Sequence, residues 1–292
     1  MKPRIIKLGT VDCDMVEVRP VVWKDALYRF EYVRPNYWDN ATGDSYFRFV
    51  EHDSGAPSEP FARGYHLGNV WAEGDLLIVT GTNIWDGERV DIFTSRDMKT
   101  WQTWNALNLS GYGIFNTSLC RGPGYYVLMF EINKPKDICG VPFTARFATS
   151  TDLKRWDLTS NECRYEPDRY TAPHCLRYLD GWYYNFYLES IGGGYEQYVV
   201  RSRDLAHWEK SPHNPVLVAS DEDRKIINPR LPKSLHERVA TAKNLNNSDI
   251  DFVEFRGRTI INYSWGNQEG IEHLAEAVYE GTEADFLRGW FS

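Results

Sequence analysis

The sequence predicts an all-β fold, a propeller of five blades with four antiparallel strands in each. Three phrases of one pattern support this prediction: "FTSRDMKTW" at 93–101, "FATSTDLKRW" at 147–156 and "VRSRDLAHW" at 200–208. Each phrase places Ser-x-Asp-(Leu or Met)-x-x-Trp after a β-type run, and the phrases recur about every fifty residues, the length of one blade. A sandwich of repeated hairpins is the alternative arrangement.

Five pairs of β-type runs, each pair joined by a tight turn, define the blades in order along one domain that spans residues 1–292. The pairs lie at 21–34, 69–83, 118–131, 175–189 and 251–265, and the blades are expected to start near residues 18, 66, 116, 171 and 248. Residues 4–11 are expected to close the ring as the outer strand of the last blade. Residues 231–244 have helical periodicity and lie in the connection between the last two blades.

The Ser-x-Asp turn has a physical reason to recur at the end of a strand. An Asp side chain at this position can accept hydrogen bonds from the backbone N–H groups that follow it, while the Leu and Trp pack against neighbouring sheets. We therefore expect Trp101, Trp156 and Trp208 to pack within and between blades, away from any binding site.

Composition narrows the class of partner and the compartment. A net charge of −8 argues against nucleic acid or an anionic membrane as partner. The five cysteines are scattered without a CxxC spacing, so neither a zinc site nor a disulfide framework is expected. The N-terminus has no signal-peptide pattern, which predicts a cytoplasmic protein. The aromatic fraction of 15% suits both β-rich packing and the stacking surfaces of a sugar site.

The topology of a propeller identifies candidate site residues, because each innermost strand begins, and each second strand ends, at the same face beside the axis. The first-strand starts supply Arg19, His66, Asn69, Asn116, His174, Asp249 and Asp251. The second-strand ends supply Glu31, Glu131 and Glu189, and Trp85 and Trp265 follow such ends in the second and fifth blades. A buried carboxylate costs free energy unless it is paired, hydrogen-bonded or used in chemistry.

Paired carboxylates are the groups that glycoside hydrolysis requires. One must be protonated to donate to the leaving oxygen, and one must be ionised to activate water or to attack the anomeric carbon. The amide, guanidinium and imidazole groups among the candidates suit the recognition of sugar hydroxyls. The structural alternative is that each glutamate is held by hydrogen bonds from neighbouring blades, or pairs with Arg19 or Arg34.

The turn phrase and the order of strands resemble the five-bladed propeller glycosidases, the broad group that includes glycoside hydrolase families 43, 32, 117 and 130. Family 43 carries an Asp near the start of the first blade, an Asp on a middle blade and a Glu in a Glu-Gly-Pro-His phrase. Here the matching stretches read "VRPVV", "FNTSL" and "TAPHC", with Arg19 (or Val18), Asn116 and Thr171 at the acidic positions. Either the acids lie elsewhere, at the second-strand ends and in the fifth blade, or the protein binds sugar without cleaving it. A histidine acid, as in family 117, keeps His174 and His66 as candidates by analogy.

We expect an exo-type, inverting glycosidase that acts on a small oligosaccharide or glycoconjugate. Glu189 is the expected general acid and Asp249 the expected base, with Glu131 and Glu31 tuning pKa values and holding hydroxyls. Arg19, His66, Asn69, Asn116, His174, Asp251, Trp85 and Trp265 are expected to contact substrate. No cofactor is expected, although a hard cation such as calcium at the axis, held by Glu31, Glu131, Glu189 and Asp249, is an alternative. A phosphorylase and a sugar-binding propeller without activity also remain open, and the oligomeric state is not predicted.

Overall fold

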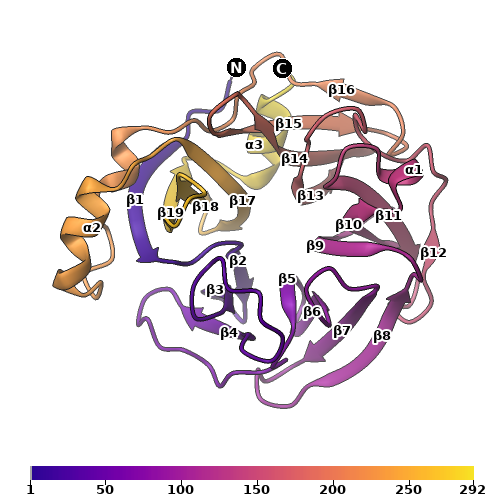
Figure 1. Ribbon diagram of the computed structural model, residues 1–292, viewed down its shortest axis with the longest axis horizontal. Helices are drawn as coiled ribbons and strands as arrows, with labels where there is room; N and C mark the ends of the chain where they lie inside the picture. Colours follow the sequence, from indigo (N-terminus) through magenta and orange to yellow (C-terminus); the bar gives the residue numbers. More distant parts are fainter. Residues whose placement is uncertain (1) are drawn as a thin grey trace.

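Residues 2–292 are described by a computed structural model in which five β-sheets are arranged in a ring around one axis (Figure 1). Blade 1 contains β2 (Arg19–Trp23), β3 (Ala26–Val33) and β4 (Tyr46–Glu51), and blade 2 contains β5 (His66–Glu73), β6 (Leu76–Thr82), β7 (Arg89–Ser95) and β8 (Gln102–Asn108). Blade 3 contains β9 (Gly113–Arg121), β10 (Tyr126–Lys134), β11 (Thr144–Ser150) and β12 (Asp157–Leu158). Blade 4 contains β13 (Pro173–Leu179), β14 (Trp182–Ser190), β15 (Tyr195–Ser202) and β16 (Trp208–Lys210). Blade 5 contains β17 (Asn246–Phe255), β18 (Arg258–Gly266), β19 (Glu272–Tyr279) and β1 (Ile6–Cys13). The predicted five-bladed propeller is confirmed.

Blade 1 differs from the other blades at its outer edge. Its sheet has three strands, whereas the other four sheets described within residues 2–292 have four. Residues 57–61 take the place of the fourth strand, but their β-type pairing with β4 is limited to two isolated bridges, Val50 to Pro57 and Phe47 to Phe61. The prediction of four strands in every blade is therefore correct for blades 2 to 5, and blade 1 has a reduced outer edge.

The three Ser-x-Asp phrases form turns of the same construction between the third and fourth strands of blades 2, 3 and 4. In the first, the Asp97 carboxylate accepts hydrogen bonds from the backbone N–H groups of Lys99 and Thr100, each at 2.8 Å. The Ser95 hydroxyl accepts from the N–H of Met98 at 2.9 Å. These hydrogen bonds lower the pKa of Asp97, because they stabilise its ionised form. The repeated sequence thus encodes a repeated hydrogen-bonded turn.

The tryptophans of these turns pack within and between blades, as predicted. Trp101 stacks on Phe61 with ring centroids 3.9 Å apart, and Phe61 in turn stacks on Phe49 of blade 1. Trp208 of blade 4 packs against Phe147 of blade 3 at 6.0 Å. The indole of Trp156 donates a hydrogen bond to the carbonyl of Leu153 in its own turn. The repeated phrase therefore supplies packing contacts, some of which join neighbouring blades.

The N-terminal strand completes the last blade, as predicted. β1 pairs antiparallel with β19, from Ile6 with Val278 to Cys13 with His273, so the two ends of the chain close the ring together. A buried network holds β1 in place: the Lys7 ammonium lies 2.8 Å from the Asp223 carboxylate, which also accepts a hydrogen bond from the Tyr263 hydroxyl at 2.7 Å. In Figure 1 the N-terminus and the C-terminus lie on the same side of the ring.

Helical segments are short and lie outside the sheets. The connection from blade 4 to blade 5 contains the 3-10 turn η1 (Asp221–Arg224), which precedes the region predicted to be helical. The 3-10 turn η2 (Lys233–Leu235) and helix α2 (His236–Thr241) lie within that region. Helix α1 (Lys136–Cys139) follows β10, and helix α3 (Glu283–Gly289) follows β19 and buries Phe286 in the core between blades 4 and 5. No helix within residues 2–292 is long and apolar enough to cross a membrane.

Candidate active site

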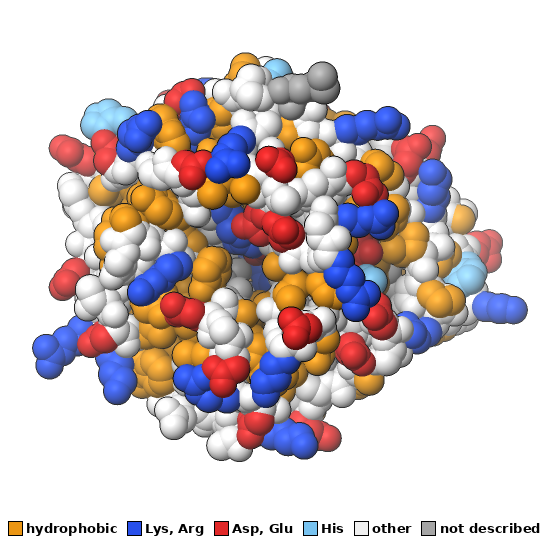
Figure 2. All heavy atoms as spheres, turned by 180° about the vertical axis from the view of Figure 1, so that it is seen from behind, with side chains coloured by type: hydrophobic (Ala, Val, Ile, Leu, Met, Phe, Trp, Pro, Cys, Tyr) orange, Lys and Arg blue, Asp and Glu red, His pale blue; other side chains and the backbone are white. Residues whose placement is uncertain are grey.

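A cavity of about 260 Å³ lies at the axis, and all five blades or their connections contribute to its wall. The lining residues are Val16, Glu17, Arg34, Tyr37, Leu67, Trp85, Phe115, Asn116, Glu131, Phe143, Tyr170, Ala172, His174, Leu188, Tyr195, Asp249 and Gln268. Figure 2 shows one face of the molecule, which is hollowed near its centre and carries acidic and basic side chains interspersed around the hollow.

Irregularities at the starts of the innermost strands bring side chains into this cavity. Within the described residues, β5, β9, β13 and β17 each break register with the second strand of their blade at this point. The residues at the breaks include Leu67, Phe115, Asn116, His174 and Asp249, which all line the cavity. A β-bulge adds a residue to one strand and re-aims its side chain, and such bulges are common at the rims of barrels and beside active sites.

Blade 1 reaches the same cavity by a different route. Its innermost strand β2 keeps regular register with β3, and the cavity residue Glu17 lies two positions before β2 begins. Glu17 has a φ of 58°, and Asp249 and Leu67 have φ values of 53° and 54°. This left-handed region costs a non-glycine residue about 1–2 kcal/mol, so the surrounding structure must hold these residues there.

Three carboxyl groups from three blades face the cavity: Glu17, Glu131 and Asp249. Burial raises the pKa of Glu17 to about 7, although the guanidinium of Arg34, 3.3 Å away, acts in the opposite direction. The charge of Asp249 contributes to the same upward shift in the pKa of Glu17. Two or more carboxylates in one partly dry cavity repel each other, so at least one retains its proton at neutral pH.

Glu131 is the carboxyl group whose surroundings most disfavour ionisation. It lies near the end of β10, opposite the bulge in β9, and its side chain is 3% exposed. Burial raises its pKa well above the ordinary value, and the charges of Glu17 and Asp249 raise it further. The one side-chain hydrogen bond it accepts comes from the neutral amide of Asn116, at 3.3 Å. Glu131 is therefore suited to hold a proton at neutral pH.

Asp249 has polar neighbours on both sides. The Ser248 hydroxyl donates to its Oδ2 at 2.7 Å, and Nδ1 of His174 lies 3.3 Å from its Oδ1 without the alignment of a hydrogen bond. Burial lowers the pKa of His174 to about 4, so this imidazole is neutral at pH 7. A neutral imidazole beside a carboxylate can orient a water molecule or a sugar hydroxyl.

An arc of aromatic rings forms one wall of the cavity. Neighbouring rings lie at centroid distances of 5.2, 5.1, 5.8 and 5.4 Å along the series Trp85, Phe115, Phe143, Tyr170 and Tyr195, with each pair tilted or edge to face. All five line the cavity, and they come from blades 2, 3 and 4. Such a wall offers flat apolar surfaces and, through Tyr170 and Tyr195, hydroxyl groups, a combination that suits the mixed polarity of a sugar ring.

The chain matches no protein-family model and no curated protein sequence, but its fold matches many solved structures. One is a glycosyl hydrolase from Bacteroides ovatus, with 14% identity over 90% of this chain and 84% of that chain, and a TM-score of 0.59. Another is from work on the GH130 family of mannoside phosphorylases, described as containing glycoside hydrolases that target β-1,2 mannosidic linkages in Candida mannan. It has 11% identity over 94% of both chains, and a TM-score of 0.61.

A third structure is an α-L-arabinofuranosidase from Fusarium graminearum in complex with an iminosugar inhibitor. It has 12% identity over 92% of this chain and 97% of that chain, and a TM-score of 0.55. The fold is that of the five-bladed propeller glycoside hydrolases. At these identities the likeness establishes the architecture, and the chemistry of the cavity has to be argued from its own residues.

Five of the residues predicted from the sequence line the axial cavity: Trp85, Asn116, Glu131, His174 and Asp249. His66 lies just behind the wall, where its Nδ1 is 2.5 Å from the Tyr32 hydroxyl and its ring packs against Trp85. Burial lowers the pKa of His66 to about 4.

Three predicted residues are buried outside the lining. Arg19, Asn69 and Asp251 lie further along their strands than the cavity residues, and Asp251 receives contacts from the other two, each at 3.5 Å. Asp251 is also bound by the guanidinium of Arg177. The prediction that these three residues contact substrate is therefore corrected, because the strands continue past the cavity floor and carry them into the core.

The expected convergence of Glu189 with Asp249 is not found. Glu189 lies outside the cavity lining, and its carboxylate pairs with Arg169 at 2.8 Å and accepts from the Tyr187 hydroxyl at 2.9 Å. The register explains the error: Tyr187, not Glu189, lies beside the bulge of β13, so Glu189 is two residues beyond the position that Glu131 holds in blade 3.

Glu31 and Trp265 also lie elsewhere. Glu31 is fully buried between the guanidinium groups of Arg29 and Arg48, at 3.1 and 2.8 Å, and faces away from the axial cavity. Trp265 is fully buried, and its indole donates a hydrogen bond to the Thr10 hydroxyl at 3.0 Å, so it belongs to the core. Of the four carboxylates named as possible ligands of an axial cation, Glu131 and Asp249 line the axial cavity, whereas Glu31 and Glu189 do not. Within residues 2–292, no group of three or more His, Cys, Asp or Glu is arranged to hold a metal.

Sequence reasoning missed several residues of the cavity, of which Glu17 is the most important for chemistry. The others that bear polar or aromatic groups are Arg34, Tyr37, Phe115, Phe143, Tyr170, Tyr195 and Gln268. Glu17 lies two residues before the predicted start at Arg19, so an extended search of the same segment finds it. Tyr170 and Tyr195 belong to connections, whose side-chain directions have no periodic signal in the sequence.

Proposed function

We propose that the protein is a glycoside hydrolase that removes a terminal, uncharged sugar from a small oligosaccharide or glycoconjugate. The observation that carries the proposal is the meeting of three carboxyl groups and an aromatic wall in one axial cavity. Its volume of about 260 Å³ is slightly below the usual range for sites of drug-sized ligands, which suits one sugar unit at a chain end. The fold likeness to glycoside hydrolases supports the same class of reaction.

In this proposal Glu131 is the general acid and Asp249 the general base. The carboxylic acid of Glu131 donates its proton to the glycosidic oxygen as the bond between that oxygen and the anomeric carbon breaks. A water molecule attacks the anomeric carbon, and Asp249 accepts a proton from this water. The products are the free sugar and an alcohol, and proton exchange with solvent restores the acid and the base. Burial and the negative charges of Glu17 and Asp249 raise the pKa of Glu131 and so keep it protonated.

Within residues 2–292, the basic side chains of the cavity carry no unpaired positive charge. This favours hydrolysis over phosphorolysis, and an uncharged sugar over an acidic one. Among the described residues, Arg34 and His174 are the basic side chains that line the cavity. Arg34 is paired with Glu17, and His174 is neutral at pH 7 because burial lowers its pKa. Neither offers a free positive charge to a phosphate or to a sugar carboxylate. Inversion fits the direct attack of water, with no covalent intermediate on a side chain.

A panel of aryl glycosides, assayed with and without phosphate, tests this proposal. On a confirmed substrate, Glu131→Gln should abolish turnover of substrates with poor leaving groups and retain part of the rate with an activated one, which needs little protonation. Asp249→Asn should not be rescued by an activated leaving group, although azide can replace the activated water. Glu189→Gln is the matched comparison, since Glu189 ends the corresponding strand of blade 4 but pairs with Arg169.

Other outcomes would contradict the proposal in distinct ways. Saturable sugar binding with no turnover would identify a binding module, and strict dependence on phosphate would identify a phosphorylase. Loss of activity in Glu189→Gln but not in Glu131→Gln would return the acid role to Glu189. Inversion is checked by following the anomeric form of the released sugar by NMR.

A further inference from the structure

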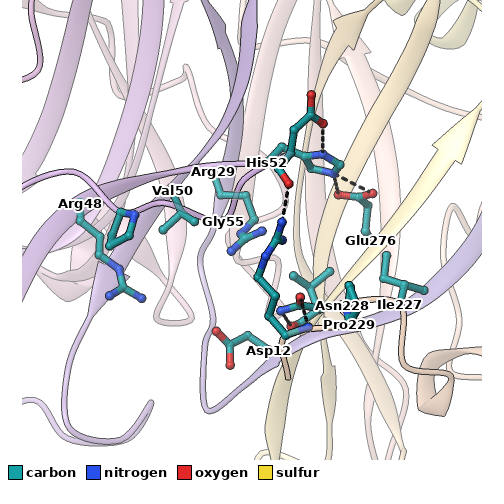
Figure 3. Close-up of a pocket in the computed structure, with 14 residues that line it drawn as sticks. Asp12, Arg29, Arg48, Val50, His52, Gly55, Ile227, Asn228, Pro229 and Glu276 are labelled. Carbon is teal, nitrogen blue, oxygen red and sulfur yellow. Dashed lines mark hydrogen bonds and ion pairs between the residues drawn. The ribbon is translucent and has the colours of Figure 1, made fainter. Parts of the chain in front are cut away.

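A second cavity, larger than the axial one, lies where blade 1 meets the closing strand of blade 5. Its volume is about 390 Å³, within the range of small-molecule sites. It is lined by residues of β1, β3 and β4, by Glu276 of β19 and by residues 227–230 of the connection that leads to blade 5, and it shares no residue with the axial cavity. Figure 3 shows Arg29, Arg48 and Asp12 arranged around the same space.

Two arginines of this cavity have unused hydrogen-bonding capacity. The Nε atoms of Arg29 and Arg48 both bind the fully buried carboxylate of Glu31, at 3.1 and 2.8 Å. No acceptor within residues 2–292 binds their Nη atoms, and these atoms are not sealed from solvent. One carboxylate therefore holds two guanidinium groups by one edge each, and their Nη groups remain free to bind a ligand in the cavity.

The charges around this space leave it with a positive excess near the two arginines. Glu31 neutralises one of the two guanidinium groups. Arg230 adds a third cation to the lining, and its Nη2 donates to the backbone carbonyl of Asp53 rather than to a carboxylate. On the far side, His52 lies 3.0 Å from the Glu276 carboxylate and 3.4 Å from the Asp53 carboxylate, and both acidic residues belong to the lining.

Asp12 is the acidic group that faces Arg29 and Arg48 most directly. Burial raises the pKa of its carboxyl group, and the charge of Glu31 raises it further, while the two arginines act in the opposite direction. A protonated Asp12 would not repel an anion and could donate a hydrogen bond to it. An ionised Asp12 instead offsets part of the positive charge of Arg29 and Arg48, while Arg230 adds a further positive charge to the lining.

We propose that this cavity binds an oxyanion, a carboxylate or phosphate group that bridges the free Nη groups of Arg29 and Arg48. The planar forks of two guanidinium groups match the paired oxygens of such a ligand, and they are already oriented by their contacts with Glu31. The ligand is either free phosphate or an acidic sugar, since each can present a pair of anionic oxygens to a guanidinium fork. The site is independent of the proposed hydrolase activity, because the two cavities are separate.

Isothermal titration of the full chain with inorganic phosphate and, separately, with glucuronate tests this inference at constant ionic strength. We expect saturable binding of at least one probe to one site, and an affinity at least about tenfold lower in Arg48→Gln, which removes one fork of charged donors. The matched control is Arg89→Gln. Like Arg48, Arg89 contacts a fully buried carboxylate through its Nε, that of Asp91 at 2.7 Å, but it lies outside this cavity. This control should retain full affinity.

A second variant predicts an effect of opposite sign. Asp12→Asn removes a negative charge from the lining and should tighten binding of either probe. A preference for phosphate or for glucuronate identifies the source of the oxyanion. Arg48→Lys, which retains the charge but not the fork, serves if thermal unfolding shows that Arg48→Gln does not fold. The inference is overturned if neither probe binds saturably, if Arg48→Gln or its substitute binds as tightly as the wild type, or if Asp12→Asn weakens binding.

Discussion

Two buried glutamates, Glu31 of blade 1 and Glu131 of blade 3, hold the same place in their sheets and have opposite surroundings. Each directly follows a phenylalanine of the second strand, Phe30 or Phe130, that pairs with the innermost strand. Their side chains are 0% and 3% exposed. Glu31 lies between two guanidinium groups, whereas the side-chain donor to Glu131 is one neutral amide, and two other carboxyl groups lie nearby.

The innermost strand accounts for the difference. In blade 3 the bulge of β9 places Asn116 against Glu131 and opens the site to the axis, while in blade 1 the strand β2 is regular. On β3 and β4, Arg29 and Arg48 then reach Glu31 from the same face of the sheet. An equivalent position in a repeated fold therefore does not imply an equivalent role. The neighbours decide whether a buried carboxyl group is an anion that holds arginines or an acid that holds a proton.

The largest expected difference between Glu131→Gln and Glu31→Gln is in kcat. We expect Glu131→Gln to reduce kcat on a substrate with a poor leaving group by about 10²–10⁴-fold, the usual contribution of general acid catalysis. Its free energy of unfolding should change little, because Gln resembles the protonated acid. Glu31→Gln, compared at equal folded fraction, should retain kcat. Equal losses of kcat in both variants would show that the comparison reflects fold integrity rather than chemistry.

The second expected effect is on stability and falls on the other glutamate. Glu31→Gln leaves Arg29 and Arg48 close together without their shared counter-charge, and should lower the free energy of unfolding by about 3 kcal/mol. Denaturant titration measures this change. High salt should recover part of the loss, since counter-ions can reach Arg48, whose side chain is 26% exposed. If Glu131→Gln destabilised the protein as much as Glu31→Gln, the assigned difference in ionisation would be wrong.

A third buried glutamate, Glu272 of β19, extends the comparison to pH. Burial raises its pKa to about 8, and its Oε1 accepts from the amide of Asn246 and the N–H of Gln268, with no cation among its partners. The native protein thus binds a proton that the unfolded chain releases near its ordinary pKa. Glu272 stabilises the fold most at low pH, and this stabilisation is lost as pH rises through about 8.

Measurements of the free energy of unfolding between pH 6.5 and 8.5 check this expectation. Burial lowers the pKa values of His66, His174 and His273, so these histidines change the stability mainly below this pH range. The free energy of unfolding should fall with rising pH, and Glu272 should account for about 1–2 kcal/mol of the fall. Glu272→Gln cannot release the proton and should flatten the slope by that amount. An unchanged slope in this variant would mean that Glu272 is ionised in the native protein.

The smallest expected effect concerns the bulge of blade 5. Asp249 has a φ of 53°, a conformation that Asn tolerates better than Ala. Both substitutions remove the charge, but Asp249→Ala should be less stable than Asp249→Asn by about 1 kcal/mol, measured by denaturant titration. Equal stabilities would indicate that the backbone at position 249 can relax. The bulge of blade 5 would then not hold Asp249 in a strained backbone conformation.

The fold could be predicted from the sequence because its repeats are local. Each Ser-x-Asp turn depends on hydrogen bonds within six residues, and each hairpin on a tight turn between two β-type runs. The expected closing role of the N-terminal strand is confirmed by the pairing of β1 with β19. Blade 1 departed from the prediction only at its outer edge, where residues 57–61 do not form a regular strand.

The site could be predicted only in part, because it depends on single-residue changes of register. The bulge beside Glu131 has no mark in the sequence "GIFNTSL", and the register in blade 4 places Tyr187, not Glu189, at the corresponding position. Asp249 and His174 were found because strand starts face the axis. Glu17 was missed because it precedes its strand, with a backbone conformation that residue type does not reveal for glutamate.

The closure of the ring by β1 sets the order of events during synthesis. β1 pairs with β19, which follows it by more than 250 residues, as Ile6 meets Val278. Blade 5 cannot be complete until β19 has been synthesised, so contacts of such high sequence separation are expected to form late and slowly. Until then β1 and the edge of β19 carry unpaired backbone groups that invite pairing with another chain. Until they pair, β1 and β19 are therefore the strands through which the nascent protein is most prone to aggregate.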